Sequence, residues 1–299
     1  MELTIGPILY EWKREEVLQF YKEAAEMPVD RVYVGEVVCT KRRALTFDDI
    51  GGIIGMLEKA GKKVTLSSLA VVSNGDELEF TRRLCAMHGS IEANDVCVLN
   101  MVDPARVEVF AGAHITTYNA PSIEFLRGLG VRRVTVPVEL PRESVEYIIK
   151  HSRGVLAEVF AHGCLPLAFS WRCYTSRAYG LSKTECRHHC ASHPDGMELK
   201  TMDGKPLFRA NGTSILSADC HTLVEETDDL RNIGVGALRI SPQYRGFAKV
   251  ADIFRARIDG RLGATEGAAL LKETGRGAFC NGWYHGRAGK DTLTGAAGD

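Results

Sequence analysis

Apolar, β-rich segments alternate with amphipathic helical segments through residues 1–160, and this alternation limits the possible folds more than any other feature of the chain. Repeated β–α units favour parallel strands joined by crossover helices, and such units close readily into a barrel. We therefore expect a TIM-barrel-like (β/α) barrel, whose chemistry lies on the loops after the carboxyl ends of the strands. The expected strands are 3–9, 31–36, 63–68, 96–100, 107–110 with 114–118, 133–138 and 155–160, and the expected helices are 13–26, 48–60, 76–87, 122–129 and 142–151.

The periodicity lapses after residue 190, where turn-forming residues accumulate in 192–204 and a hairpin is expected at 206–216. Helix–strand–helix character then returns at 223–233, 237–240 and 247–257, and a Gly-rich tail follows at 260–299. An open doubly wound sheet is the alternative fold, but its Gly-rich dinucleotide fingerprint is missing. We expect one barrel domain over residues 1–299, with an irregular cysteine-bearing insertion after a late barrel strand.

Charge and hydropathy indicate neither a nucleic-acid partner nor a membrane. The formal net charge is −1, and the composition is that of a globular protein with 45% hydrophobic residues. No basic and apolar leader occurs at the N-terminus, and no apolar run is long enough for a membrane span. We expect a cytoplasmic protein, in which nine cysteines stay reduced and serve metal or redox chemistry rather than a disulfide framework.

Residues 158–190 (EVFAHGCLPLAFSWRCYTSRAYGLSKTECRHHC) form a cysteine-rich segment that begins as a strand and then presents Cys173, Cys186 and Cys190. Thiolates this close together suit zinc or an iron–sulfur cluster, and the spacing alone leaves both open. A fourth ligand should also follow a strand, because strand-end loops share one face of a barrel. Cys39 lies three residues beyond the expected strand 31–36, whereas Cys164 is its chief competitor.

The other cysteines and the nearby histidines are weaker candidates. Cys85 falls in an expected helix and Cys97 in an expected strand, and buried thiols of this kind are common in protein cores. Cys220 and Cys280 are expected in loops and rank behind Cys39 and Cys164 as ligands. The two histidines inside the cysteine pair, His188 and His189, are either ligands or solvent-facing neighbours.

Hydrolytic motifs are missing: the chain has no G-x-S-x-G elbow, no H-E-x-x-H and no P-loop. Glu158 and His162 flank the end of the strand that precedes the cysteines. They are candidate proton-transfer groups of a pocket, and a structural carboxylate at Glu158 is an equally good interpretation.

At these residues the sequence resembles peptidase family U32, whose signature is an E-x-F strand followed by H-G and a run of cysteines. The matching residues here are EVFAHG at 158–163 and Cys173, and CNGWYHGRAG at 280–289 is similar to a late element of the family. Because hydrolytic motifs are missing, we do not expect a peptidase. The first signature cysteine is replaced by Pro166, as in the branch of the family named for the ubiquinone biosynthesis protein UbiV.

The resemblance to this branch implies a [4Fe–4S] cluster on Cys39, Cys173, Cys186 and Cys190. It also implies a heterodimer with a UbiU-like protein and oxygen-independent hydroxylation of a polyprenylated aromatic ring in anaerobic ubiquinone biosynthesis, with prephenate as the hydroxyl donor. Under this hypothesis the pocket residues are Glu158, His162, Asn281 and His285. The alternatives are a U32-type factor that hydroxylates tRNA or rRNA, and a non-catalytic scaffold that a metal only stabilises.

Overall fold

Eight parallel strands close into a barrel in the computed structural model, which describes residues 1–42, 44–275 and 278–293. Strands β1 to β7 pair in chain order, and β11 pairs with both β7 and β1 to complete the circle. The expected TIM-barrel-like fold is therefore confirmed. The barrel strands are β1 (Glu2–Ile5), β2 (Arg31–Gly35), β3 (Lys63–Ser67), β4 (Ser90–Ala93), β5 (Glu108–Ala111), β6 (Val131–Thr135), β7 (Leu156–Phe169) and β11 (Ala237–Ile240).

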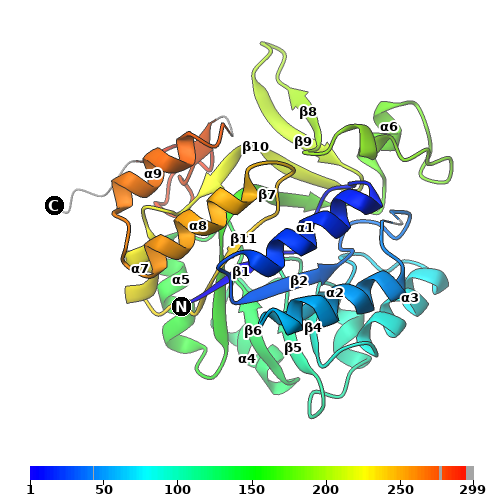
Figure 1. Ribbon diagram of the computed structural model, residues 1–299, viewed down its shortest axis with the longest axis horizontal. Coiled ribbons are helices and arrows are strands. Elements are labelled where there is room, and N and C mark those ends of the chain that lie inside the picture. Colours follow the sequence, from blue (N-terminus) through cyan, green and yellow to red (C-terminus); the bar gives the residue numbers. More distant parts are fainter. Residues whose placement is uncertain (43, 276–277, 294–299) are drawn as a thin grey trace.

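Helices pack around this barrel, as Figure 1 shows for α1, α2 and α8 in front of the strands. Their starts are set by local sequence: Thr46 and Asn74 each accept a hydrogen bond from a backbone N–H of the first turn that follows. Apolar residues on the outward face of the strands and on the inner face of the helices form one hydrophobic core. The helices are α1 (Arg14–Glu26), α2 (Phe47–Lys59), α3 (Gly75–Cys85), α4 (Ala120–Gly128), α5 (Arg142–His151), α7 (Thr227–Asn232), α8 (Phe247–Ile258) and α9 (Ala264–Lys272).

Strand β7 is 14 residues long, and its outer half leaves the barrel and carries the cysteine-bearing insertion. There β7 pairs antiparallel with β10 (Ser214–Thr222), which pairs in turn with β9 (Pro206–Asn211) and through it with β8 (Met197–Lys200). Residues 170–213, here called the insertion, also contain α6 (Tyr174–Ala178) and the 3-10 helix η2 (His189–Ser192). Figure 1 shows the β8–β9 hairpin and α6 projecting from one end of the barrel. The expected hairpin and insertion are confirmed.

Two expected strands are wrong. Residues 96–100 form the 3-10 helix η1 (Val96–Asn100), because Asp95 accepts a hydrogen bond from the Cys97 N–H and starts a helical turn. The true fourth strand, β4, precedes it, and its inward-facing Glu92 interrupts the apolar pattern. Residues 114–118 form an irregular loop after β5.

The C-terminal region is more ordered than a Gly-rich tail suggests. Residues 260–299 contain helix α9, and the short strand β12 (Phe279–Cys280) pairs with β10. Cys220 and Cys280 therefore lie in strands rather than in the loops expected for them. Residues 276, 277 and 294–299 of this tail lie outside the described residues. Among the helices that the structure describes, none has both the length and the apolar character needed to cross a membrane.

Strand β10 lies between β7 and β12 and carries the buried His221. We expect this histidine to make the stability of the protein depend on pH. Burial lowers the pKa of His221 from its ordinary value of 6.5 to about 4. Between these values the unfolded chain binds one more proton at this site, so stability is present above pH 6.5 and is lost as the pH falls. As the pH falls, the free energy of unfolding of the wild type should decrease by up to about 3 kcal/mol more than that of His221→Gln. Urea unfolding at several pH values between 7 and about 4 measures it.

The exposed His151 of α5 provides the matched control. Unfolding of His151→Gln is measured over the same pH range beside the wild type, whose slope of unfolding free energy against pH is the reference. A His221→Gln protein with that same slope would show that His221 is not the group responsible.

Candidate functional site

The loop after β2 holds Cys39 against the insertion. The carboxylate of Glu36 accepts the N–H groups of Val38 and Cys39, at 2.7 and 2.9 Å, and so shapes the loop. The Val38 carbonyl accepts the hydroxyl of Thr213 from the end of the insertion, at 2.9 Å. Lys41 Nζ donates to the Lys183 carbonyl, at 2.5 Å. Cys39 therefore lies beside the segment that carries the other three predicted ligands.

Arg42 connects this loop to the rest of the site. Its guanidinium is 6% exposed and donates to the Leu9 carbonyl and to Asn211 Oδ1, both at 2.6 Å. The Arg42 Nε atom is buried with no hydrogen-bond partner among the described residues, and it lies 3.6 Å from Glu11 Oε2. A buried cation thus stands next to the cysteine loop. It would favour a negatively charged group at this place.

Cys173 and Cys190 come together within the insertion. Cys173 is the N-cap of α6, where its sulfur accepts the Ser176 N–H at 3.3 Å. Cys190 is 9% exposed and donates its S–H to Glu11 Oε2 at 2.8 Å. Burial raises the pKa of Cys190 to about 12, with further contributions from Glu11 and from the neighbouring Cys173. In this arrangement the Cys190 sulfur is paired with Glu11 through a hydrogen bond.

Cys186 lies at the outer edge of the same group. Its sulfur accepts the His188 N–H at 3.5 Å, and His188 Nδ1 lies 2.9 Å from Glu11 Oε1. Glu11 thus contacts both His188 and Cys190. Within 1–42, 44–275 and 278–293, no three His, Cys, Asp or Glu side chains lie close enough together to hold a metal ion. The four cysteines are gathered at one end of the barrel, and their role as ligands stays a prediction.

The donor set fits an iron–sulfur cluster on chemical grounds. Four cysteine thiolates are the usual ligands of a [4Fe–4S] cluster, and two of the four thiols already interact with each other. Burial raises the pKa of Cys39, whereas the positive charges of Arg42 and Lys183 act in the opposite direction. Metal binding requires deprotonated thiols, so these cations would support ligation at Cys39.

A pocket opens at the carboxyl ends of the barrel strands, beside the cysteines. Its walls come from residues that follow β1, β2, β4, β5 and β11, together with β7. The pocket and the cysteine site share two loops, because Leu9 and Val37 line the pocket while Leu9 binds Arg42 and Val37 precedes Cys39. The lining residues are Gly6, Pro7, Leu9, Val37, Glu92, Asn94, Ala113, His114, Phe160, Pro166, Arg239 and Ser241.

His114 lines this mouth pocket and is the histidine among its lining residues. Its ring lies 4.1 Å from the ring of Phe169, centroid to centroid, and it also borders an adjoining pocket with Tyr118 and Phe169. Burial, and then the charge of Arg239, lowers the pKa of His114 to about 3. It is therefore a neutral imidazole, which can donate or accept a hydrogen bond but is a weak base. Sequence reasoning missed His114, although its position after a strand was the signal.

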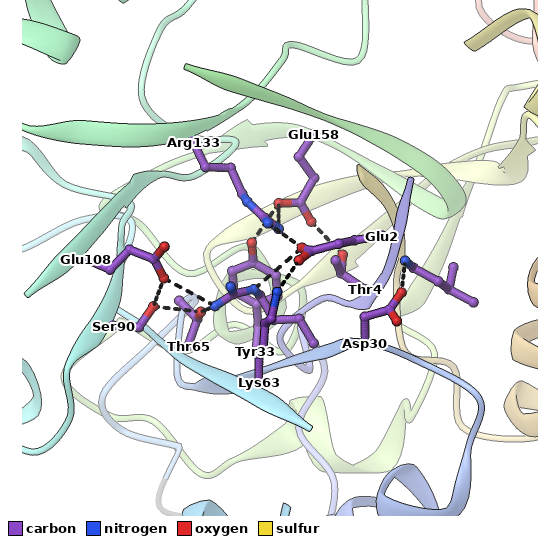
Figure 2. Close-up of polar contacts among 12 residues, drawn as sticks. Glu2, Thr4, Asp30, Tyr33, Lys63, Thr65, Ser90, Glu108, Arg133 and Glu158 are labelled. Atoms are coloured by element: carbon purple, nitrogen blue, oxygen red, sulfur yellow. Dashed lines mark hydrogen bonds and ion pairs between the residues drawn. The ribbon is translucent and has the colours of Figure 1, made fainter. Parts of the chain in front are cut away.

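Glu158 does not line the mouth pocket but fills the barrel interior. Figure 2 shows its carboxylate among Thr4, Tyr33 and Arg133, all pointing toward one another. Thr4 and Tyr33 donate hydroxyl hydrogen bonds to it at 2.5 and 2.6 Å, while Arg133 and Arg239 lie at 3.3 and 3.1 Å. These contacts favour a structural role, and proton transfer by Glu158 is an untested prediction.

The remaining predicted pocket residues lie elsewhere. His162 is fully buried on β7, between the rings of Phe254 and Phe279. Asn281 and His285 both contact Glu226 Oε1, at 2.8 Å, just before α7. None of the three is among the residues that line the mouth pocket. The structure therefore does not bring Glu158, His162, Asn281 and His285 into one pocket.

Comparison with known protein families decides the family. The sequence model of peptidase family U32 matches residues 16–294. This chain belongs to peptidase family U32. The U32 chain is also similar to the 23S rRNA 5-hydroxycytidine C2501 synthase of Escherichia coli (strain K12), with 23% identity over 248 residues. The match covers 78% of this chain but only 36% of that relative's length.

Solved structures resemble the U32 chain only distantly. A truncated 3-deoxy-D-arabino-heptulosonate 7-phosphate synthase from Thermotoga maritima gives a TM-score of 0.47 at 9% identity, covering 93% of this chain and 89% of that one. N-acetylneuraminate lyase from Fusobacterium nucleatum gives 0.47 at 10% identity, covering 91% and 79%.

Proposed function

We propose that this protein is the iron–sulfur subunit of an oxygen-independent hydroxylase that acts on a polyprenylated aromatic ring in anaerobic ubiquinone biosynthesis. Its [4Fe–4S] cluster would be held by Cys39, Cys173, Cys186 and Cys190. The observation that carries the proposal is the buried Arg42, whose charge acts on both Cys39 and Cys190, next to a pocket at the barrel mouth. Membership of the U32 family and similarity to an enzyme named for hydroxylating a cytidine ring support it.

The chain's own residues would prepare the cluster site. Cys190 Sγ must lose its proton to become a ligand, and Glu11 Oε2 already accepts that proton in a 2.8 Å hydrogen bond. Arg42 then offsets the negative charge of the thiolates from a position where water is excluded. When bound, the cluster would supply electron transfer. It would lie near the mouth pocket, because the proposed cluster site and the pocket share two loops.

The aromatic ring of the substrate would lie in the adjoining pocket, because the mouth pocket has room for only about one water molecule. The rings of His114 and Phe169 offer stacking surfaces there, and Pro166 lines both pockets. The neutral imidazole of His114 would donate or accept a hydrogen bond at the ring that is hydroxylated. As the hydroxyl donor we propose prephenate, which the resemblance to the UbiV branch implies. Arg239 in the pocket lining is already paired with Glu92 and Glu158, so this part of the proposal does not rest on its charge.

A UbiU-like partner is part of the proposal. The β8–β9 hairpin projects from the barrel and exposes three large apolar side chains, Met202, Leu207 and Phe208. Trp171 and Tyr179 of the same insertion are also exposed. Apolar groups gathered on a projecting element are typical of a protein–protein contact.

The direct test is to purify the chain with its partner under nitrogen and to measure iron, acid-labile sulfide and the visible absorption spectrum. We expect about four irons and four sulfides per chain of this protein and a broad charge-transfer band. A strain without this gene should lose ubiquinone during anaerobic growth and keep it in air. Zinc in place of iron, or normal anaerobic ubiquinone in that strain, would contradict the proposal.

A second candidate is hydroxylation of RNA, which the similarity to the 23S rRNA 5-hydroxycytidine synthase favours. The net charge of −1 argues against it, because RNA-binding surfaces carry an excess of Lys and Arg. Mass spectrometry of nucleosides from the deletion strain separates the two candidates. Loss of a hydroxylated nucleoside with unchanged ubiquinone would establish the RNA function.

A further inference from the structure

Two cysteines outside the predicted cluster site face each other at the base of the insertion. Cys164 lies on β7, which leads into the insertion, and Cys220 lies on β10, which leads out of it. The two residues are direct partners in the antiparallel register, and both are thiols in the structure. Figure 1 shows β7 and β10 running beside each other between the barrel and the β8–β9 hairpin.

Backbone hydrogen bonds show that Cys164 and Cys220 form a non-hydrogen-bonded pair. The Cys220 N–H donates to the Ala278 carbonyl at 3.0 Å, on the side of β10 that faces β12. On β7, the His162 carbonyl accepts from the Ser241 N–H at 2.8 Å, on the side that faces β11. Along a strand, the direction of the backbone N–H and carbonyl groups repeats every second residue. The N–H and carbonyl of Cys164, two residues after His162, therefore also point away from β10.

This geometry suits a disulfide. In a non-hydrogen-bonded antiparallel pair the Cα atoms are about 4.5 Å apart, and the two side chains leave the sheet on the same face. Disulfides span Cα separations of about 4.4–6.8 Å. The usual separation of such a pair thus falls within the range that a disulfide spans.

The surroundings of Cys220 favour its reaction. Its sulfur lies 3.7 Å from His162 Nε2 and 3.5 Å from Gln243 Nε2. An imidazole at this distance can take the thiol proton, and an amide N–H stabilises the resulting thiolate. Cys220 is 3% exposed and out of reach of a reagent, whereas Cys164 is partly exposed. Cys164 is thus the thiol that a reagent can reach, and Cys220 is the thiol whose neighbours favour deprotonation.

Cys280 is the third thiol in this region and the obvious competitor. It interacts electrostatically with Cys164, but burial raises its pKa to about 12. At neutral pH it stays protonated and is a poor nucleophile. It also lies on β12, beyond β10 from β7, so the strand register does not pair it with Cys164.

We propose that Cys164 and Cys220 form a reversible disulfide on reaction with a small-molecule disulfide such as oxidised glutathione. Cys164 loses its proton to water and attacks one sulfur of the reagent, which forms a mixed disulfide and releases one thiol. Cys220 gives its proton to His162 Nε2 and attacks Cys164 Sγ, which releases the second thiol. Two cysteine thiols are oxidised, and one reagent disulfide is reduced to two thiols.

The bond would fix the insertion to the barrel. On β10, three residues lie between Leu216 and Cys220, namely Ser217, Ala218 and Asp219. On β7, only Leu165 lies between their partners, Pro166 and Cys164. The ladder is therefore interrupted next to the cysteine pair, and a covalent link would hold the strands together at this point. The inference needs only the strand register and the two thiols, so it stands whether or not the protein binds a cluster.

The test uses the full chain, reduced and kept under nitrogen, then titrated with oxidised glutathione, alkylated and digested without reduction. We expect mass spectrometry to find the Cys164 and Cys220 peptides joined, with the loss of two alkylatable thiols per chain. Dithiothreitol should restore both. The Cys220→Ser protein should instead accumulate glutathione on Cys164, because the second step is blocked. Recovery of both cysteines fully alkylated after the titration would overturn the proposal.

Two further variants keep the test specific. Cys280→Ser should form the link as the wild type does, and a link from Cys164 to Cys280 would contradict the proposed pairing. His162→Gln should slow the second step and so raise the amount of mixed disulfide on Cys164. An unchanged ratio of mixed to internal disulfide in this variant would remove His162 from the mechanism.

Discussion

Replacing Glu158 by Gln is expected to lower the free energy of unfolding by about 3–5 kcal/mol. Glu158 is fully buried in the barrel, and its carboxylate is the common partner of the Arg133 and Arg239 guanidinium groups. Glutamine has the same size but no charge. Both guanidinium groups would then lose a negatively charged partner while remaining buried away from water. Removing one partner of a buried ion pair is strongly destabilising, because the charge that remains is no longer fully compensated.

Urea unfolding of wild type and Glu158→Gln at neutral pH measures the difference. The matched control is Glu124→Gln, which removes an ion pair between Glu124 and Arg127 on the surface of α4. We expect this control to unfold at the wild-type urea concentration, because exposed pairs contribute little. Equal midpoints for Glu158→Gln and wild type would mean that the interior network does not stabilise the barrel.

The same carboxylate makes the difference depend on pH. Burial alone would raise the pKa of Glu158, but the charges of Arg239 and Arg133 outweigh it and hold the pKa at about 2. The ordinary value is 4.5, so the unfolded chain binds more protons between pH 4.5 and about 2. The stabilisation is therefore complete above pH 4.5 and is lost as the pH falls. The advantage of wild type over Glu158→Gln should shrink across this range.

The barrel could be predicted from the sequence because alternation of strands and helices is a property of the chain itself. The strand β4 could not, because its sequence SIEA is short and contains a charged residue. In the barrel that charge is compensated by Arg239, whose nitrogen lies 2.7 Å from Glu92. Arg239 follows Glu92 by 147 positions in the chain (239 − 92). No local sequence pattern can therefore indicate this ion pair. Cys220 and Cys280 were misplaced for the same reason, since β12 forms only by pairing with β10.

The candidate site was predictable in part. A strand-end position made Cys39 a candidate ligand beside Cys164, and the structure places the Cys39 loop against the insertion through Lys41 and Val38. In the sequence, Arg42 stands in the basic run Lys41-Arg42-Arg43, and this local pattern gives no sign that the residue is buried. Its burial and its contacts with Leu9 and Asn211 depend on parts of the chain that meet only in the folded barrel. The mouth pocket with His114 was missed for this reason too.

We expect Cys39→Ala to abolish most of the iron bound per chain, which is the largest functional effect predicted here. Cys39 is the only one of the four proposed ligands that lies outside the insertion, so it would tie the cluster to the barrel. Without it, three thiolates remain on a segment that includes the short helices α6 and η2. Iron, sulfide and the visible spectrum of protein purified under nitrogen measure the loss.

Cys97→Ala is the matched control, because Cys97 is also a partly exposed thiol but lies in η1, away from the insertion. Its iron content should equal that of the wild type. A stability measurement of both apo proteins is needed beside the iron assay, because a fold that collapses also loses its metal. Cys39 takes part in the fold through its backbone N–H, which alanine keeps. We therefore expect similar apo stability for the two variants, and iron retained in Cys39→Ala would move the fourth ligand to another residue.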